Sequence, residues 1–471
     1  MKKVFSNFLY QASYQVLLII LPVVTIPIVS TALGKEGIGT YNFISSIVNY
    51  FVLVAGLGLA NYGVREIAIV RDNRKKLSEK FWELQLFNLF FSLSSLILFL
   101  FFAVSREEER LYLVQSMVVL ATVFDISWFF SGIENFKKIT IRNFIIKIIT
   151  FLLIFFLIKT EQDLLKYFII QGGGTLLGSL SLWINLTDYV DFTKIKIKNI
   201  FLHFVPAVTY FIAKIAISLY QNLTKTILGL VVSIGALGLY ANAMSLITMT
   251  GSIINAMNTV MIPRMSKIAN SGGKEDIIPI LVKVIHLQIY ITIAMSFGIA
   301  GISGTLVPWF FGPDFKELIL ILPVLSPVLI FQSLQMSIAT QYLIPFGKMK
   351  EYNLSVILGA LVSVLTTLLL SLKIGVFGAV VGISFGYMTI CVIRSYKLIK
   401  STTFRYNWID LGKYLISGIV MMSSVYLLGL NLTPTIGTTF IQILVGGIIY
   451  MGISLALKAN PLYMLVFRKR R

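Results

Sequence analysis

The sequence predicts an all-α polytopic membrane protein with about 14 transmembrane helices, in two six-helix lobes followed by two C-terminal helices. Two observations predict this class. Hydrophobic residues make up 57% of the 471 residues and charged residues only 13%, whereas charged residues make up about 25% of a typical soluble domain. Apolar runs of about 20 residues, enough for a helix to cross a bilayer, recur from one end of the chain to the other.

These apolar runs define the predicted spans. Their ranges are 9–33, 42–64, 81–104, 112–132, 143–158, 165–184, 203–230, 237–262, 280–304, 318–345, 352–372, 375–397, 410–430 and 436–457. The beginning, MKKVFSNFLYQ, is similar to a signal peptide, but the apolar run that follows is too long for one and contains Pro22 and Pro27. We therefore expect an uncleaved first span. The longest polar loops have about 20 residues, too few for a soluble catalytic domain.

The basic residues predict the orientation of these spans. The net charge is +20, from 40 Lys and Arg against 20 Asp and Glu. We count 28 of the basic residues on the side of the N-terminus and about six in the opposite loops. Basic loops stay in the cytoplasm, so both termini are predicted to be cytoplasmic. The same placement argues against nucleic acid as a partner.

A weak internal repeat predicts the domain organisation. Gly39-Thr40-Tyr41 opens the second span and Gly238-Leu239-Tyr240 opens the eighth, at an offset that also maps Arg65 onto Arg264. We therefore expect one lobe in residues 1–200 and a second in 201–400, with two further helices and a basic tail in 401–471. Repeats of this kind place the substrate path between the lobes.

The seventh span carries a basic stripe. His203, Lys214 and Lys225 lie eleven residues apart, almost three helical turns, so each is rotated by only about 20° from the last. Charged groups on a membrane helix normally face a bundle interior or a water-filled cavity. The alternative is that Lys225 and His203 extend to the two membrane surfaces, which is harder for Lys214 near the middle. The candidate substrate-binding residues are Lys214, Lys225, Tyr210, Ser218, Gln221, Arg65 and Arg264.

Two of these candidates have an alternative explanation, and one acidic residue stands apart. Arg65 and Arg264 close the second and eighth spans, where the topology rule alone also places basic residues. Asp125 lies in the fourth span, where a carboxylate is either a cation or proton site or the partner of a basic group. Asp125 is the candidate for ion coupling.

No catalytic or metal-binding motif is present. The glycines at 172–174 lack the Lys-Ser/Thr of a phosphate loop and lie inside a span, so close helix packing is the better explanation. There is no HExxH, GxSxG or Cys/His cluster, and the single cysteine, Cys391, excludes a disulfide within the chain. We expect no enzyme activity, metal or cofactor, and Na⁺ or H⁺ coupling stays open.

Two segments resemble a known family. They read PVVTIPIVSTALGKEGIGTYNFISSIVNYFVLVAGLGLANYGVREIA and DISWFFSGIENFKKITIRN. Their patterns, LGxxGxGxY, GxxxYGxRE and DxSWxFxGxE, resemble those of the Wzx-type lipid-linked oligosaccharide flippases, the polysaccharide transporter family of the multidrug/oligosaccharidyl-lipid/polysaccharide exporter superfamily. The resemblance covers nearly the whole chain and is best over residues 1–270.

The resemblance implies two six-helix lobes in a V around a central cavity, in the cytoplasmic (inner) membrane. It also implies transport of undecaprenyl-pyrophosphate-linked repeat units to the outer leaflet for capsule, O-antigen or exopolysaccharide assembly. Membrane lipids, a polysaccharide polymerase and chain-length proteins are the implied partners. The family's acidic residue near the end of the seventh span, usually followed by a basic one, appears here as Thr224-Lys225, so the acid is missing.

The basic stripe suits this activity, because lysines in a cavity attract a pyrophosphate whose charges must leave water.

Two alternatives remain. A cation-coupled multidrug or metabolite exporter of the same superfamily would use Asp125 as its coupling site, although most of the charge inside the spans is basic. A membrane-embedded glycan polymerase or ligase would need a large outer loop, and no outer loop is long enough.

Overall fold

A computed structural model describes residues 2–193, 197–271 and 277–461. Within these ranges the chain is helical and contains no strand. Twelve stretches of helix are long and apolar enough to cross a membrane, so the chain is a multi-pass membrane protein. It divides into two compact units, Met1–Thr226 and Ile227–Arg471, which are treated separately below.

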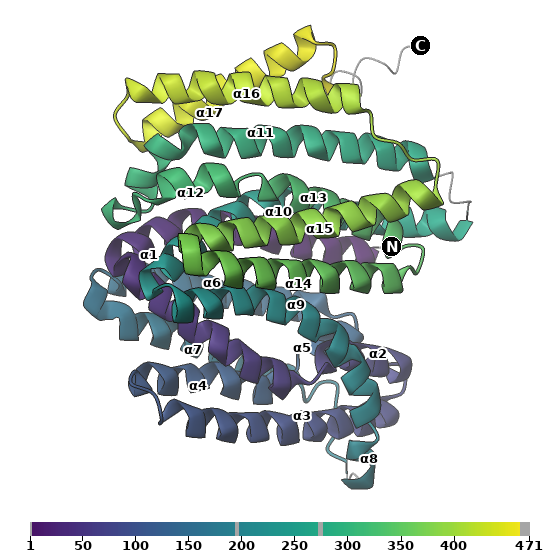
Figure 1. Cartoon of the computed structure of the whole chain (residues 1–471). Coiled ribbons are helices and arrows are strands. Elements are labelled where there is room, and N and C mark those ends of the chain that lie inside the picture. The colour runs from purple at the N-terminus through teal and green to yellow at the C-terminus, as the bar shows by residue number, and fades with distance from the viewer. Residues whose placement is uncertain (1, 194–196, 272–276, 462–471) are drawn as a thin grey trace. The chain divides into compact units, whose positions relative to one another are not determined.

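Helix α1 (Lys2–Gly56) contains a kink at Gly34. At Gly34 the backbone has φ 61° and ψ −178°, a conformation that glycine adopts without steric cost. Figure 1 shows the purple ribbon turning back at this bend. A side chain at Gly37 would not fit beyond it, because its Cβ would lie 2.9 Å from the Cβ of Leu33. The predicted spans 9–33 and 42–64 therefore fall on the two sides of the bend in α1, and the second continues into α2 (Leu59–Val70).

Shorter helices complete the first unit. They are α3 (Arg74–Ala103), α4 (Glu109–Phe124), α5 (Ser127–Gly132), α6 (Phe136–Leu157), α7 (Leu164–Ser181), α8 (Ile197–Phe201) and α9 (Phe204–Val231), with 3₁₀ turns at Glu161–Asp163 and Trp183–Asn185. The predicted span 112–132 is interrupted between α4 and α5, where Asp125 has an extended backbone with ψ 104°. Helix α9 covers the predicted seventh span and runs past the boundary between the units.

The two segments that carry the family resemblance pack on each other in the core of the first unit. A Cβ added at Gly63 of α2 would lie 2.8 Å from the Trp128 ring, and one added at Gly132 would lie 2.6 Å from Ile67. The glycines thus let α2 and α5 approach closely, as small residues do between membrane helices. Trp128 and its neighbours Phe129 and Phe130 are buried there. These motif residues have a packing role.

The glycine run at 172–174 also serves packing. Gly172 faces α4, where an added Cβ would lie 3.4 Å from the Met117 side chain, and Gly174 faces Thr150 of α6 at 2.9 Å. Around Gly173 there is open space. The prediction of close helix packing is confirmed for Gly172 and Gly174.

The second unit contains the remaining helices. They are α10 (Ile234–Ser271), α11 (Ile278–Phe310), α12 (Leu318–Leu325), α13 (Val328–Ile338), α14 (Met349–Ile374), α15 (Val376–Ser401), α16 (Trp408–Leu430) and α17 (Ile436–Ala456), with a 3₁₀ turn at Pro313–Phe315 and a π-helical turn at Ala339–Leu343. Helices α14 and α15 lie side by side (Figure 1). Glycines allow this, since a Cβ at Gly378 would lie 2.2 Å from the backbone nitrogen of Ser371.

Candidate functional site

His203 lies apart from the rest of the predicted basic stripe. It precedes the first residue of α9 and is only 4% exposed. Its Nδ1 is 2.7 Å from the Tyr62 hydroxyl, and its Nε2 is 3.4 Å from a carboxylate oxygen of Glu83. His203 therefore joins α2 to α3 in the core of the first unit and faces neither a cavity nor a membrane surface. Tyr210 belongs to the same core, with its ring centroid 6.0 Å from that of Tyr62.

Lys225, at the other end of the stripe, contacts a polar face of α1. The ammonium Nζ of Lys225 donates to Oδ1 of Asn42 at 3.0 Å. The amide of Asn42 is itself oriented by donating to the Ile38 carbonyl at 3.0 Å. Lys225 is half-buried, and none of the ion pairs in the described part of the chain involves it. Its charge is thus held in place by a neutral acceptor and is not cancelled.

Further polar contacts follow the same two helices. The Ser46 and Tyr50 hydroxyls lie 3.0 and 2.9 Å from Thr226 Oγ1. Asn49 Nδ2 donates to Asn222 Oδ1 at 3.4 Å. On α1 these positions are four, seven and eight residues beyond Asn42, which places them on one helical face. We call this set the α1–α9 polar seam; it comprises Asn42, Ser46, Asn49, Tyr50, Asn222, Lys225 and Thr226.

The other predicted substrate-binding residues are not members of the seam. Ser218 adjoins the seam, because its backbone oxygen and its hydroxyl accept from Asn222 Nδ2 at 3.0 and 3.3 Å. The side chains of Lys214 and Gln221 lie outside the described residues. Arg65 is exposed on α2 of the first unit and Arg264 is exposed on α10 of the second.

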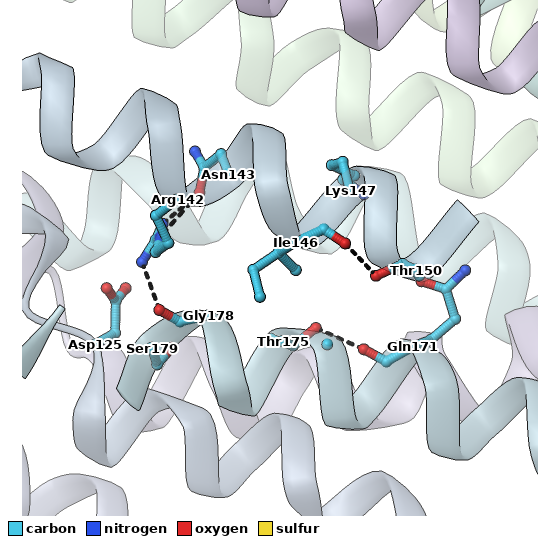
Figure 2. Close-up of a pocket in the computed structure, with 11 residues that line it drawn as sticks. Asp125, Arg142, Asn143, Ile146, Lys147, Thr150, Gln171, Thr175, Gly178 and Ser179 are labelled. Atoms are coloured by element: carbon cyan, nitrogen blue, oxygen red, sulfur yellow. Dashed lines mark hydrogen bonds between the residues drawn. The ribbon is translucent and has the colours of Figure 1, made fainter. Parts of the chain in front are cut away.

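Asp125 lies in a separate pocket of about 250 Å³ (Figure 2). One carboxylate oxygen accepts from the Ser127 backbone nitrogen at 3.0 Å, in the turn that leads into α5. The other lining residues come from two neighbouring helices. They are Arg142, Asn143, Ile146, Lys147 and Thr150 of α6, and Gln171, Gly174, Thr175, Gly178 and Ser179 of α7.

The basic residues of this pocket bear on the role of Asp125. Arg142 donates through Nε and Nη2 to Asn143 Oδ1 at 2.9 and 2.6 Å, and through Nη1 to the Gly178 carbonyl at 3.3 Å. Figure 2 shows Asp125 at the end of the pocket nearest Arg142. Asp125 thus lies beside one basic side chain of the pocket. Both interpretations of Asp125, ion coupling and pairing with a basic group, stay predictions.

Sequence reasoning identified residues of α9 in the seam and Asp125 in the pocket, but not the residues that surround them. The α1 face of the seam had a signal, because Asn42, Ser46 and Asn49 recur at helical spacing, but nothing in the sequence pairs them with α9. Arg142 lies just outside the predicted span 143–158 and Lys147 lies inside it, so no pattern in the sequence groups them in one pocket. Among the described residues, no three His, Cys, Asp or Glu side chains form a group suited to a metal ion.

Known proteins resemble this chain in sequence and in fold. A sequence model of the family described as "Polysaccharide biosynthesis protein" matches residues 4–269. A protein of Escherichia coli (strain K12) named "Putative O-antigen transporter" is 22% identical over 404 residues, which cover 83% of this chain and 95% of that protein. A protein of Shigella dysenteriae with the same name is 23% identical over 305 residues, covering 63% and 74%.

Two solved structures share the fold. The structure titled "Lipid II flippase MurJ, inward closed conformation" matches with a TM-score of 0.73 at 17% identity, over 96% of this chain and 99% of that one. An inward-facing multidrug resistance MATE family transporter of the MOP superfamily matches with a TM-score of 0.61 at 15% identity, over 86% and 94%. At these identities the likeness concerns the fold alone.

Proposed function

Because the chain belongs to the polysaccharide biosynthesis protein family, we propose that it is a flippase for lipid-linked oligosaccharides. Its cargo would be an undecaprenyl-pyrophosphate-linked repeat unit, moved across the cytoplasmic membrane for capsule, O-antigen or exopolysaccharide assembly. The observation that carries the proposal is Lys225, a lysine on a membrane helix that is oriented by Asn42 and has no acidic partner in the described part of the chain. The names of the E. coli and Shigella relatives support the choice of cargo.

The chemistry of the cargo explains why such a lysine is useful. A pyrophosphate must lose hydration to cross the hydrocarbon layer, which is costly unless another charge replaces the water. Lysine is a compact charge on a flexible stem, so it follows a passing phosphate more readily than a rigid guanidinium does. The α1–α9 polar seam supplies neutral donors and acceptors beside it for the sugar hydroxyls. In this proposal Lys214, on the same predicted stripe, continues the path.

The sequence-based topology is part of the same proposal. We expect 14 spans, both termini in the cytoplasm, and two lobes at 1–200 and 201–400 that alternate in access. The bend in α1 and the position of α9 support two spans beyond the 12 found by length and composition. Asp125 remains the candidate if Na⁺ or H⁺ drives transport. A polymerase and chain-length proteins are the proposed partners.

A proteoliposome assay tests the proposed activity. The vesicles contain a fluorescent polyprenyl-pyrophosphate oligosaccharide, and a quencher added outside reports the fraction that reaches the outer leaflet over time. We expect the protein to accelerate the exchange well above protein-free vesicles. A parallel set measures uptake of cationic dyes. Dye transport under an ion gradient, with no movement of the glycan lipid, would contradict the proposal and favour the exporter alternative.

A further inference from the structure

Lys147 lies in a membrane-spanning helix, close to one end of the predicted span. The span predicted from the sequence covers residues 143–158, so Lys147 is four residues inside it. At 1.5 Å per residue this is about 6 Å from the membrane surface, a distance that a lysine side chain can bridge. Its ammonium therefore reaches the depth of the lipid headgroups.

The ammonium of Lys147 has no assigned partner. No hydrogen bond or ion pair between described residues involves it. A lysine just inside the membrane surface extends to water or to an anionic group at that surface. Lys147 lines the pocket that also holds Arg142 and Asp125. Figure 2 places Asp125 at the Arg142 end, which leaves the charge of Lys147 in excess.

The rest of the pocket is polar and kept open by glycine. Thr150 of α6 and Gln171 and Thr175 of α7 present hydroxyl and amide groups to it. A Cβ added at Gly178 would meet nothing closer than the Ile146 side chain at 3.8 Å, so the space beyond this glycine is empty. The pocket therefore has room for a small anionic group with hydrogen-bond acceptors.

The surface around the pocket is apolar. Only 17% of the most apolar stretch of α6 is buried, the smallest share among the 12 candidate spans. The exposed side chains of α6 near Lys147 are large and apolar; they are Phe144, Ile145, Ile149, Leu152 and Leu153. A ligand whose charged group entered the pocket would thus have a hydrocarbon-compatible surface beside it for an attached chain.

We propose that this pocket binds the phosphate headgroup of an anionic lipid, with Lys147 and Arg142 contacting the phosphate and the lipid chain lying along α6. The phosphate offsets the excess positive charge of the pocket, and its oxygens accept from the Lys147 ammonium and the Arg142 guanidinium. The proposal does not depend on which cargo the protein transports, because the pocket shares no residue with the α1–α9 polar seam.

Native mass spectrometry of the purified full-length protein tests this site. The protein is titrated with phosphatidylglycerol, with phosphatidylcholine, and with inorganic phosphate as the competitor without a chain. We expect phosphatidylglycerol to bind the wild type more tightly than phosphatidylcholine. Lys147→Gln should weaken binding of phosphatidylglycerol by roughly tenfold, the effect of losing one charge-assisted hydrogen bond, and Lys147→Arg should retain most of it.

Two further variants separate the pocket from general surface charge. Gly178→Leu keeps both basic residues but fills the pocket, and should weaken binding as Lys147→Gln does. Thr175→Leu fills it from an exposed position if Gly178→Leu does not fold. Lys350→Gln removes an exposed lysine of α14 and should change nothing. Equal binding of phosphatidylglycerol by wild type and Lys147→Gln would overturn the proposal, and so would displacement of the lipid by inorganic phosphate at equal concentration.

Discussion

The two ends of the basic stripe both carry a basic residue, but the two residues differ in their partners. At one end His203 is buried between Tyr62 and Glu83, and every interaction it makes holds the first unit together. At the other end Lys225 is half-buried, and its one hydrogen bond among the described residues is to Asn42. The difference suggests judging a basic group within a membrane protein by its partners as well as by its spacing. In our proposal His203 is structural, whereas Lys225 keeps its charge for a ligand.

The largest expected effect on stability is at the His203 end. His203→Ala would leave the Tyr62 hydroxyl unpaired, at a cost of about 1–3 kcal/mol. It would also remove one partner of the Glu83 carboxylate, which keeps its contacts with Lys80 and Asn199. We expect a clear loss of stability in equilibrium unfolding in mixed micelles. His286→Ala is the matched control, because His286 is also buried but its Nε2 has no hydrogen-bond partner among the described residues. Equal losses in the two variants would remove the distinction drawn for His203.

Lys225 should show the opposite pattern, with a large effect on transport and a small one on stability. Lys225→Ala removes a charged donor to the cargo, worth roughly 1.5–3 kcal/mol, or about a tenfold to hundredfold fall in flipping rate. Lys225→Arg keeps the charge and should retain more activity than Lys225→Ala. The measurement is the initial rate in proteoliposomes at matched protein content. If Lys225→Ala proves as destabilised as His203→Ala, the two ends of the stripe have the same role.

Asn42→Ala tests whether orientation of Lys225 matters apart from its charge. This change removes the acceptor of the lysine and leaves the lysine in place. We expect an intermediate fall in flipping rate, smaller than that of Lys225→Ala, because a disordered ammonium still attracts the pyrophosphate. The double variant with Lys225→Ala should be no slower than Lys225→Ala alone, since the two residues act through one contact. Additive losses would mean that Asn42 acts independently.

The smallest effect is expected at Tyr50. Tyr50→Phe removes one of the two hydroxyls that contact Thr226 and leaves Ser46 in place. The cost should be about 1 kcal/mol or less in unfolding free energy, with the flipping rate unchanged. A strong loss of transport in this variant would extend the functional part of the seam from Lys225 to its neutral members.

Periodicity predicted the helical class and the position of Lys225 on α9, because both depend on residues close together in the sequence. Periodicity did not predict the direction of the His203 side chain, because α9 begins only after that residue. The contacts of Lys225 with Asn42 join positions 183 residues apart, which no local pattern encodes. The break at Asp125 was missed because the apolar run continues through it, and the pocket was missed because its two basic residues lie on either side of a predicted span boundary.

The central claim is that Lys225 meets the pyrophosphate of the cargo, and its most direct test compares two headgroups. Flipping rates are measured for one oligosaccharide linked to the polyprenyl chain through either a pyrophosphate or a single phosphate, with wild type and Lys225→Ala side by side. We predict that the wild type moves the pyrophosphate form faster and that Lys225→Ala loses most of this preference. An unchanged preference in Lys225→Ala, with the protein folded and at normal abundance, would contradict the claim.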